Sequence, residues 1–107
     1  MIKNAFQIKE RDIVLVKLSK VYDNGRKKRP VIVIKIKNDK LYVRALGTSI
    51  PLGKNYKMFK PSSDWFEGSY QFPSELILVS EIAETTCKEV FEVIGRITNK
   101  GCKELNI

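Results

Sequence analysis

The chain has 107 residues, of which 43% are apolar, so it can form one domain over residues 1–107 and is too short for two. Twenty lysines and arginines against twelve acids give a formal net charge of +8, which favours a polyanionic partner. No apolar run is long enough to span a membrane, and the chain opens without a signal-peptide pattern. We therefore expect a cytoplasmic protein with no membrane contact.

The residue types also limit the chemistry. Histidine is absent, and Cys87 and Cys102 are too far apart in sequence for a CxxC pair, so no Cys/His nucleophile or thiolate metal pair can form. No DxD or DxN cluster marks a carboxylate metal site. We expect reduced structural thiols, no metal and no cofactor.

The charges are unevenly spread. Nine basic residues and two acids lie between Lys17 and Lys40, whereas seven acids and a single lysine lie between Asp64 and Glu92. This asymmetry fits an oriented contact with nucleic acid, and equally well an ordinary solvated surface.

The first half of the chain reads as strands and turns. Residues 12–18 are apolar and β-branched and precede the turn signal Asp23-Asn24-Gly25. A second strand is expected over 30–36, with its proline at the start, where a missing backbone donor is tolerated. Asn38-Asp39 predicts a tight turn into a strand over 41–46, which completes a hairpin.

The second half is less regular. The stretch 47–73 is rich in Gly, Pro, Ser and aromatic residues and is a candidate binding segment, with a short strand expected near 56–59. Residues 75–82 predict another strand. The segment 89–97 also matches helical spacing, but its β-branched residues favour a strand.

The chain ends in a predicted short helix over 99–105. Thr98 is a suitable N-cap, although Gly101 lowers the helix propensity. Many short strands with little helix predict a mainly β protein, a small antiparallel barrel or roll with a short C-terminal helix.

Four motifs follow one another along the chain: Asp12–Val16, Asp23-Asn24-Gly25 with Lys28–Ile34, Ser74–Ile82 and Ile94–Thr98. In this order they resemble the MazF/PemK-type toxins, and the similarity covers residues 6–105. Arg11 departs from the pattern because the family usually has glycine there, and the basic loop is short and lacks the usual Glu or Gln.

This resemblance implies an SH3-like barrel of the MazF/CcdB/PemK kind that forms a homodimer. Its groove would bind single-stranded RNA, and the tail of an antitoxin protein would compete for that groove. The family's catalytic arginine precedes a proline, which places it at Arg29 here. Its hydroxyl partner is a threonine at the end of the third strand, and Thr48 falls there.

The reaction itself favours these residue types. Attack of a ribose 2′-oxygen on the adjacent phosphate builds negative charge, which a planar guanidinium can stabilise through two parallel hydrogen bonds. Arg29 suits that role, with Thr48 donating a hydrogen bond to the phosphate. The plainer alternatives are a surface cation for Arg29 and a turn-capping hydroxyl for Thr48.

Other residues are candidates for RNA binding. Phosphates could be held by Arg26, Lys27 and Lys28, with Ser49 beside the catalytic threonine, although a basic triplet is also typical of a solvated loop tip. Trp65 and Phe66, close to Tyr70 and Phe72, could stack on bases, but such aromatics more often fill the end of a barrel. Glu67 and Asp64 are candidates for a general base or a base-edge reader.

Two functions therefore remain open. The first is an endoribonuclease toxin that cleaves messenger RNA by metal-independent transphosphorylation. The second is a non-catalytic module on the same fold that binds nucleic acid or, like CcdB, gyrase. Arg29 paired with Thr48 favours the first, because binding alone needs no such pair.

Overall fold

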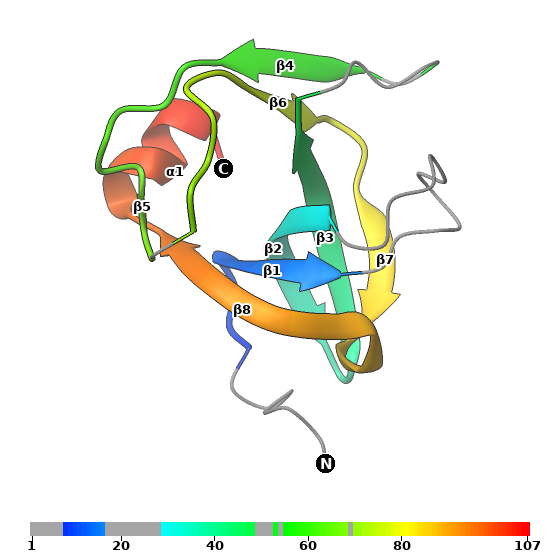
Figure 1. Ribbon diagram of the computed structural model, residues 1–107. Helices are drawn as coiled ribbons and strands as arrows, with labels where there is room; N and C mark the ends of the chain where they lie inside the picture. Colours follow the sequence, from blue (N-terminus) through cyan, green and yellow to red (C-terminus); the bar gives the residue numbers. More distant parts are fainter. Residues whose placement is uncertain (1–7, 17–28, 49–52, 54, 69) are drawn as a thin grey trace.

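The computed structural model describes residues 8–16, 29–48, 53, 55–68 and 70–107 of the chain. In this part the chain is mainly β, with eight strands, one 3₁₀ turn and one short C-terminal helix (Figure 1). The elements are β1 (Asp12–Val16), β2 (Arg29–Lys37), β3 (Lys40–Gly47), β4 (Tyr56–Phe59), β5 (Phe66–Glu67), β6 (Leu76–Val79), β7 (Ala83–Thr86), η2 (Cys87–Glu89), β8 (Val90–Ile97) and α1 (Asn99–Leu105).

The strands form one antiparallel sheet. Its pairing order is β4-β6-β3-β2-β1-β8-β5, and β7 also pairs with β3. Among the described residues this path is open, because its end strands β4 and β5 each have one neighbour. The antiparallel β architecture is confirmed, whereas closure into an SH3-like barrel stays a prediction.

The central hairpin follows the sequence closely. β2 pairs with β3 from Val31 opposite Ala45 to Lys37 opposite Lys40. Asn38 in the connecting turn has a φ of 58°, a left-handed conformation that asparagine adopts more readily than most residues. The predicted turn at Asn38-Asp39 is thus confirmed.

The central strands are buried on both faces. Val14 and Val31 belong to one buried cluster, while their sequence neighbours Ile13 and Ile32 belong to a second. Because successive side chains point to opposite faces of a strand, the continuous apolar runs of β1 and β2 supply both clusters. The second cluster also contains Leu105, so α1 packs over that face.

The helix begins where the sequence predicts. Thr98 accepts a hydrogen bond from the backbone N–H of Gly101, at 3.0 Å, which satisfies an otherwise exposed donor. Gly101 is buried, and a Cβ at this position would overlap the carbonyl oxygen of Trp65. The glycine that lowers helix propensity therefore permits the close packing of α1.

The second half departs from the prediction in two places. The strand expected over 75–82 is shorter, β6 over Leu76–Val79, and β7 follows at Ala83–Thr86, where no strand was predicted. β3 pairs with β6 near its end and with β7 near its start. Between β6 and β7, the N–H of Ser80 donates to Asn55 O, at 2.9 Å. The short β5 and η2 were not predicted, while the strand over 89–97 is confirmed as β8.

β8 is a long strand that runs from one side of the molecule to the other (Figure 1). Figure 1 shows β8 curving from the side that carries β7 to the side that carries β5 and α1. No helix in the described ranges is long and apolar enough to cross a membrane.

Candidate functional site

Arg29 is the first residue of β2, and the register places it at one end of the sheet. It pairs with Val16, the last residue of β1. The β2–β3 register, extended by two residues from Val31 and Ala45, places Arg29 opposite Gly47 on the other side. Arg29 therefore lies where the end of β1, the start of β2 and the end of β3 meet.

The guanidinium of Arg29 rests against Gly47. Arg29 Nη1 lies 3.0 Å from the position that a Cβ on residue 47 would take. The side chain is half-buried, and its Nε is fully buried. Gly47 thus leaves the space that the guanidinium occupies, a role that the sequence signalled only by a glycine at a strand end.

Thr48 directly follows Gly47 and is exposed. The two residues predicted to act together are therefore gathered at the same end of the β2–β3 hairpin. The guanidinium of Arg29 and the hydroxyl of Thr48 are both groups that donate hydrogen bonds to phosphate oxygens.

The basic residues between Lys17 and Lys40 do not all lie near Arg29. Lys35, Lys37 and Lys40 lie toward the turn, away from Arg29, and Lys40 forms an ion pair of 3.5 Å with Glu84. These three lysines therefore lie apart from Arg29 along the hairpin. The predicted RNA-binding residues Arg26, Lys27, Lys28 and Ser49 lie outside the described residues.

Burial argues against base stacking by Trp65. Its side chain is 3% exposed and belongs to the second core cluster. Its ring centroid lies 4.8 Å from that of Phe66 and 5.2 Å from that of Phe72. Neither face of Trp65 is available to a base, so the assignment of Trp65 to base stacking is wrong, and the residue is part of the core. Phe66 is half-buried within the same aromatic group.

The two candidate acids lie far from Arg29 in the register. Glu67 on β5 pairs with Arg96 on β8, and Arg96 pairs with the first residue of β1, Asp12. Arg29 instead pairs with the last residue of β1, at the opposite end of that strand. Asp64 forms an ion pair of 3.2 Å with Lys100 on α1. The register therefore gives no support to either acid as a general base for Arg29.

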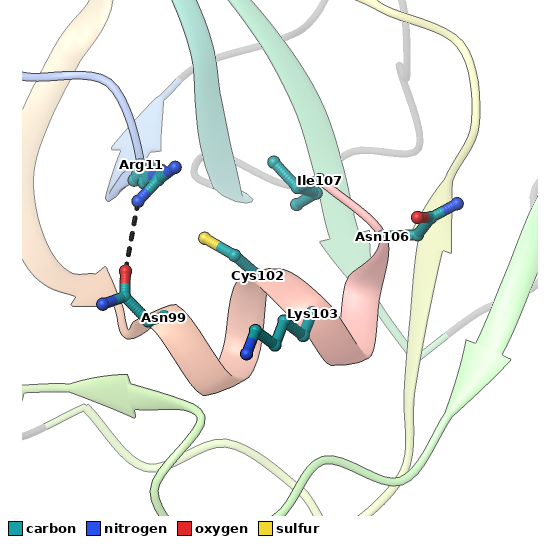
Figure 2. A pocket seen from close by; sticks show the side chains of 6 residues that line it. All are labelled: Arg11, Asn99, Cys102, Lys103, Asn106 and Ile107. Carbon is teal, nitrogen blue, oxygen red and sulfur yellow. Dashed lines mark hydrogen bonds between the residues drawn. The ribbon is translucent and has the colours of Figure 1, made fainter.

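A shallow pocket of about 410 Å³ lies beside α1 (Figure 2). Arg11, directly before β1, donates from Nη1 to Asn99 Oδ1 at 3.4 Å across its edge. Arg11 has a φ of 78°, a left-handed conformation that favours glycine. The pocket is lined by Arg11, Asn99, Cys102, Lys103, Asn106 and Ile107.

Cys87 and Cys102, both described, form no disulfide, and burial raises the pKa of the Cys87 thiol, as does the charge of Asp39. Within the described ranges no three Cys, Asp or Glu side chains gather into a metal-binding group. Comparison of the chain with known protein families and with curated proteins found no match.

Proposed function

We propose that this protein is a toxin endoribonuclease of the MazF/PemK type that cleaves single-stranded RNA. The observation that carries the proposal is the guanidinium of Arg29, seated against Gly47 beside the exposed Thr48. The family resemblance predicts these two residues as partners, and they lie at the ends of neighbouring strands.

Arg11 supports the same proposal from another part of the chain. It stands where the resembled family has glycine, and its φ of 78° lies in the left-handed region. A glycine at this position would adopt the same conformation without strain.

In the proposed reaction protons are exchanged with water. The ribose 2′-oxygen gives its proton to water and bonds to the adjacent phosphorus, and the bond from phosphorus to the 5′-oxygen breaks as that oxygen takes a proton from water. Arg29 would bind two phosphate oxygens as charge builds on them, and Thr48 would donate to the same phosphate. The products are a 2′,3′-cyclic phosphate and a 5′-hydroxyl.

The proposal extends to the assembly. An SH3-like barrel, a homodimer with a shared RNA groove and an antitoxin that occupies the groove follow from the resemblance. The alternative is a module that binds nucleic acid or gyrase without catalysis. In that case Arg29 would contribute only its positive charge.

The test is incubation of the purified protein with a long unstructured RNA in EDTA, with the fragment ends mapped. Cleavage should proceed and leave the ends named above. Arg29→Lys keeps the charge and loses the two-pronged contact, so single-turnover cleavage should fall at least about 100-fold, or about 3 kcal/mol, with RNA affinity nearly unchanged. Thr48→Ala should behave likewise.

Three results would contradict the proposal: strict dependence on added Mg²⁺, 5′-phosphate ends, or equal loss of binding and cleavage in Arg29→Lys. Binding without cleavage by the unaltered protein would favour the non-catalytic alternative.

A further inference from the structure

A row of paired residues leads from Arg29 to the edge strand β4. Ile77 on β6 pairs with Gly47 on one side and with Met58 on the other. Directly opposed residues on neighbouring strands share one face of a sheet. Met58 therefore lies on the face to which Gly47 belongs, where the Arg29 guanidinium is seated.

Tyr56 lies on the same face, because it precedes Met58 by two residues on one strand. Both residues are exposed, Tyr56 by 38% and Met58 by 51%. They form an exposed pair, which we name the β4 platform.

The strand that carries the platform is anchored in the core. Phe59, at the end of β4, packs into the second core cluster with its ring centroid 6.0 Å from that of Trp65. Figure 1 shows β4 beside β6 at the margin of the molecule. The anchored strand therefore displays Tyr56 and Met58 without losing much conformational freedom when they bind a ligand.

The surroundings of the platform suit a nucleic acid. Lys60 is exposed directly after β4, two residues beyond Met58, whereas Lys57 belongs to the opposite face of the strand. A cation beside stacking side chains is the usual arrangement of single-strand binding surfaces. Strands in a sheet are about 4.8 Å apart, so the three steps from β2 to β4 span about 14 Å along the sheet. A short run of unpaired nucleotides bridges that distance.

We propose that the β4 platform binds an unpaired base of the RNA whose phosphate lies at Arg29, with Tyr56 as the stacking ring and Met58 packed beside it. This inference rests on the proposed function and adds the position of a flanking nucleotide. Binding of a base at the platform would hold the RNA across the end of the sheet, so that one of its phosphates stays at Arg29.

The test compares Tyr56→Ala with Tyr70→Ala. Tyr70 has the same 38% exposure but lies outside β4, near Phe72, so it is a matched control. The probe is a short fluorescein-labelled single-stranded RNA of random sequence. Tyr56→Ala should weaken its binding about tenfold, Tyr56→Phe should restore it, and Tyr70→Ala should leave it unchanged.

Several outcomes would overturn the platform, and they separate it from the proposed function. Cleavage by the unaltered protein with unchanged RNA affinity in Tyr56→Ala would remove the platform and leave the ribonuclease intact. A change of molecular mass in Tyr56→Ala, measured by light scattering, with unchanged RNA affinity would make β4 a contact between copies of the chain. Absence of both RNA binding and cleavage in the unaltered protein would remove the proposed function and the platform with it.

Discussion

Two glycines, Gly101 on α1 and Gly47 at the end of β3, serve opposite purposes. Gly101 lets the backbone of α1 approach the carbonyl oxygen of Trp65, in a region where helix, aromatic rings and β8 are packed together. Gly47 instead leaves space for the charged end of a side chain at the rim of the sheet. The first glycine serves folding, and the second positions the group on which the proposed chemistry depends.

The aromatic residues show the same contrast. Trp65 lies in the core beneath α1, while Tyr56 is exposed on β4. The composition of the segment 47–73 predicted base stacking by Trp65, yet of these two residues only Tyr56 is exposed. The helix side therefore serves stability, and the proposed RNA contact lies on the side that carries Arg29 and β4.

The largest expected effect is on the helix side. Gly101→Ala places a methyl group against a backbone carbonyl that cannot move aside cheaply, so the free energy of unfolding should fall by about 3 kcal/mol. Urea denaturation followed by circular dichroism measures it. Equal stability of the variant and the unaltered protein would show that α1 does not pack as described.

Gly47→Ala should produce a smaller effect of a different kind. The added Cβ would stand 3.0 Å from Arg29 Nη1, so the flexible guanidinium should shift by a few tenths of an ångström while the fold persists. Cleavage should fall about tenfold through misplacement of the reacting groups, with the melting temperature nearly unchanged.

A double variant provides the control for this effect. In an Arg29→Lys background, Gly47→Ala should add little further loss of cleavage, because both changes act on one group. Full additivity, or a loss of stability in the single variant, would indicate that Gly47 does not act through Arg29.

The smallest expected effect is on the melting temperature, and it comes from a polar cluster that connects the segment before Trp65 to α1. Ser62 Oγ lies 2.5 Å from Glu104 Oε2 and 3.0 Å from Asp64 Oδ1, and Lys100 pairs with Asp64. Hydrogen bonds from Lys100 and then Ser62 lower the pKa of Asp64 from its ordinary 3.8. Hydrogen bonds from the Ser62 side chain and backbone lower the pKa of Glu104 from its ordinary 4.5.

Because the folded pKa values lie below the unfolded ones, the cluster stabilises the protein fully above about pH 5 and loses this contribution as the pH falls through the folded values. Ser62→Ala should lower the melting temperature near neutral pH, and the difference from the unaltered protein should shrink below about pH 4. Thermal unfolding at several pH values measures it, and a constant difference would contradict this account.

Local patterns determined much of the fold. The β-branched runs of β1 and β2, the Asn38-Asp39 turn and the Thr98 cap each depend on residues close in sequence, which set backbone conformation directly. The general position of Arg29, before a proline at the start of a strand, also follows from the sequence.

Only the tertiary structure decided which side chains meet. Nothing local shows that Trp65 is buried under α1, that Gly101 is needed for that contact, or that β3 exchanges β7 for β6. The row from Arg29 through Gly47 and Ile77 to Met58 likewise depends on strands far apart in the chain. Register between such strands is fixed by packing of the whole sheet, and packing cannot be read from one segment alone.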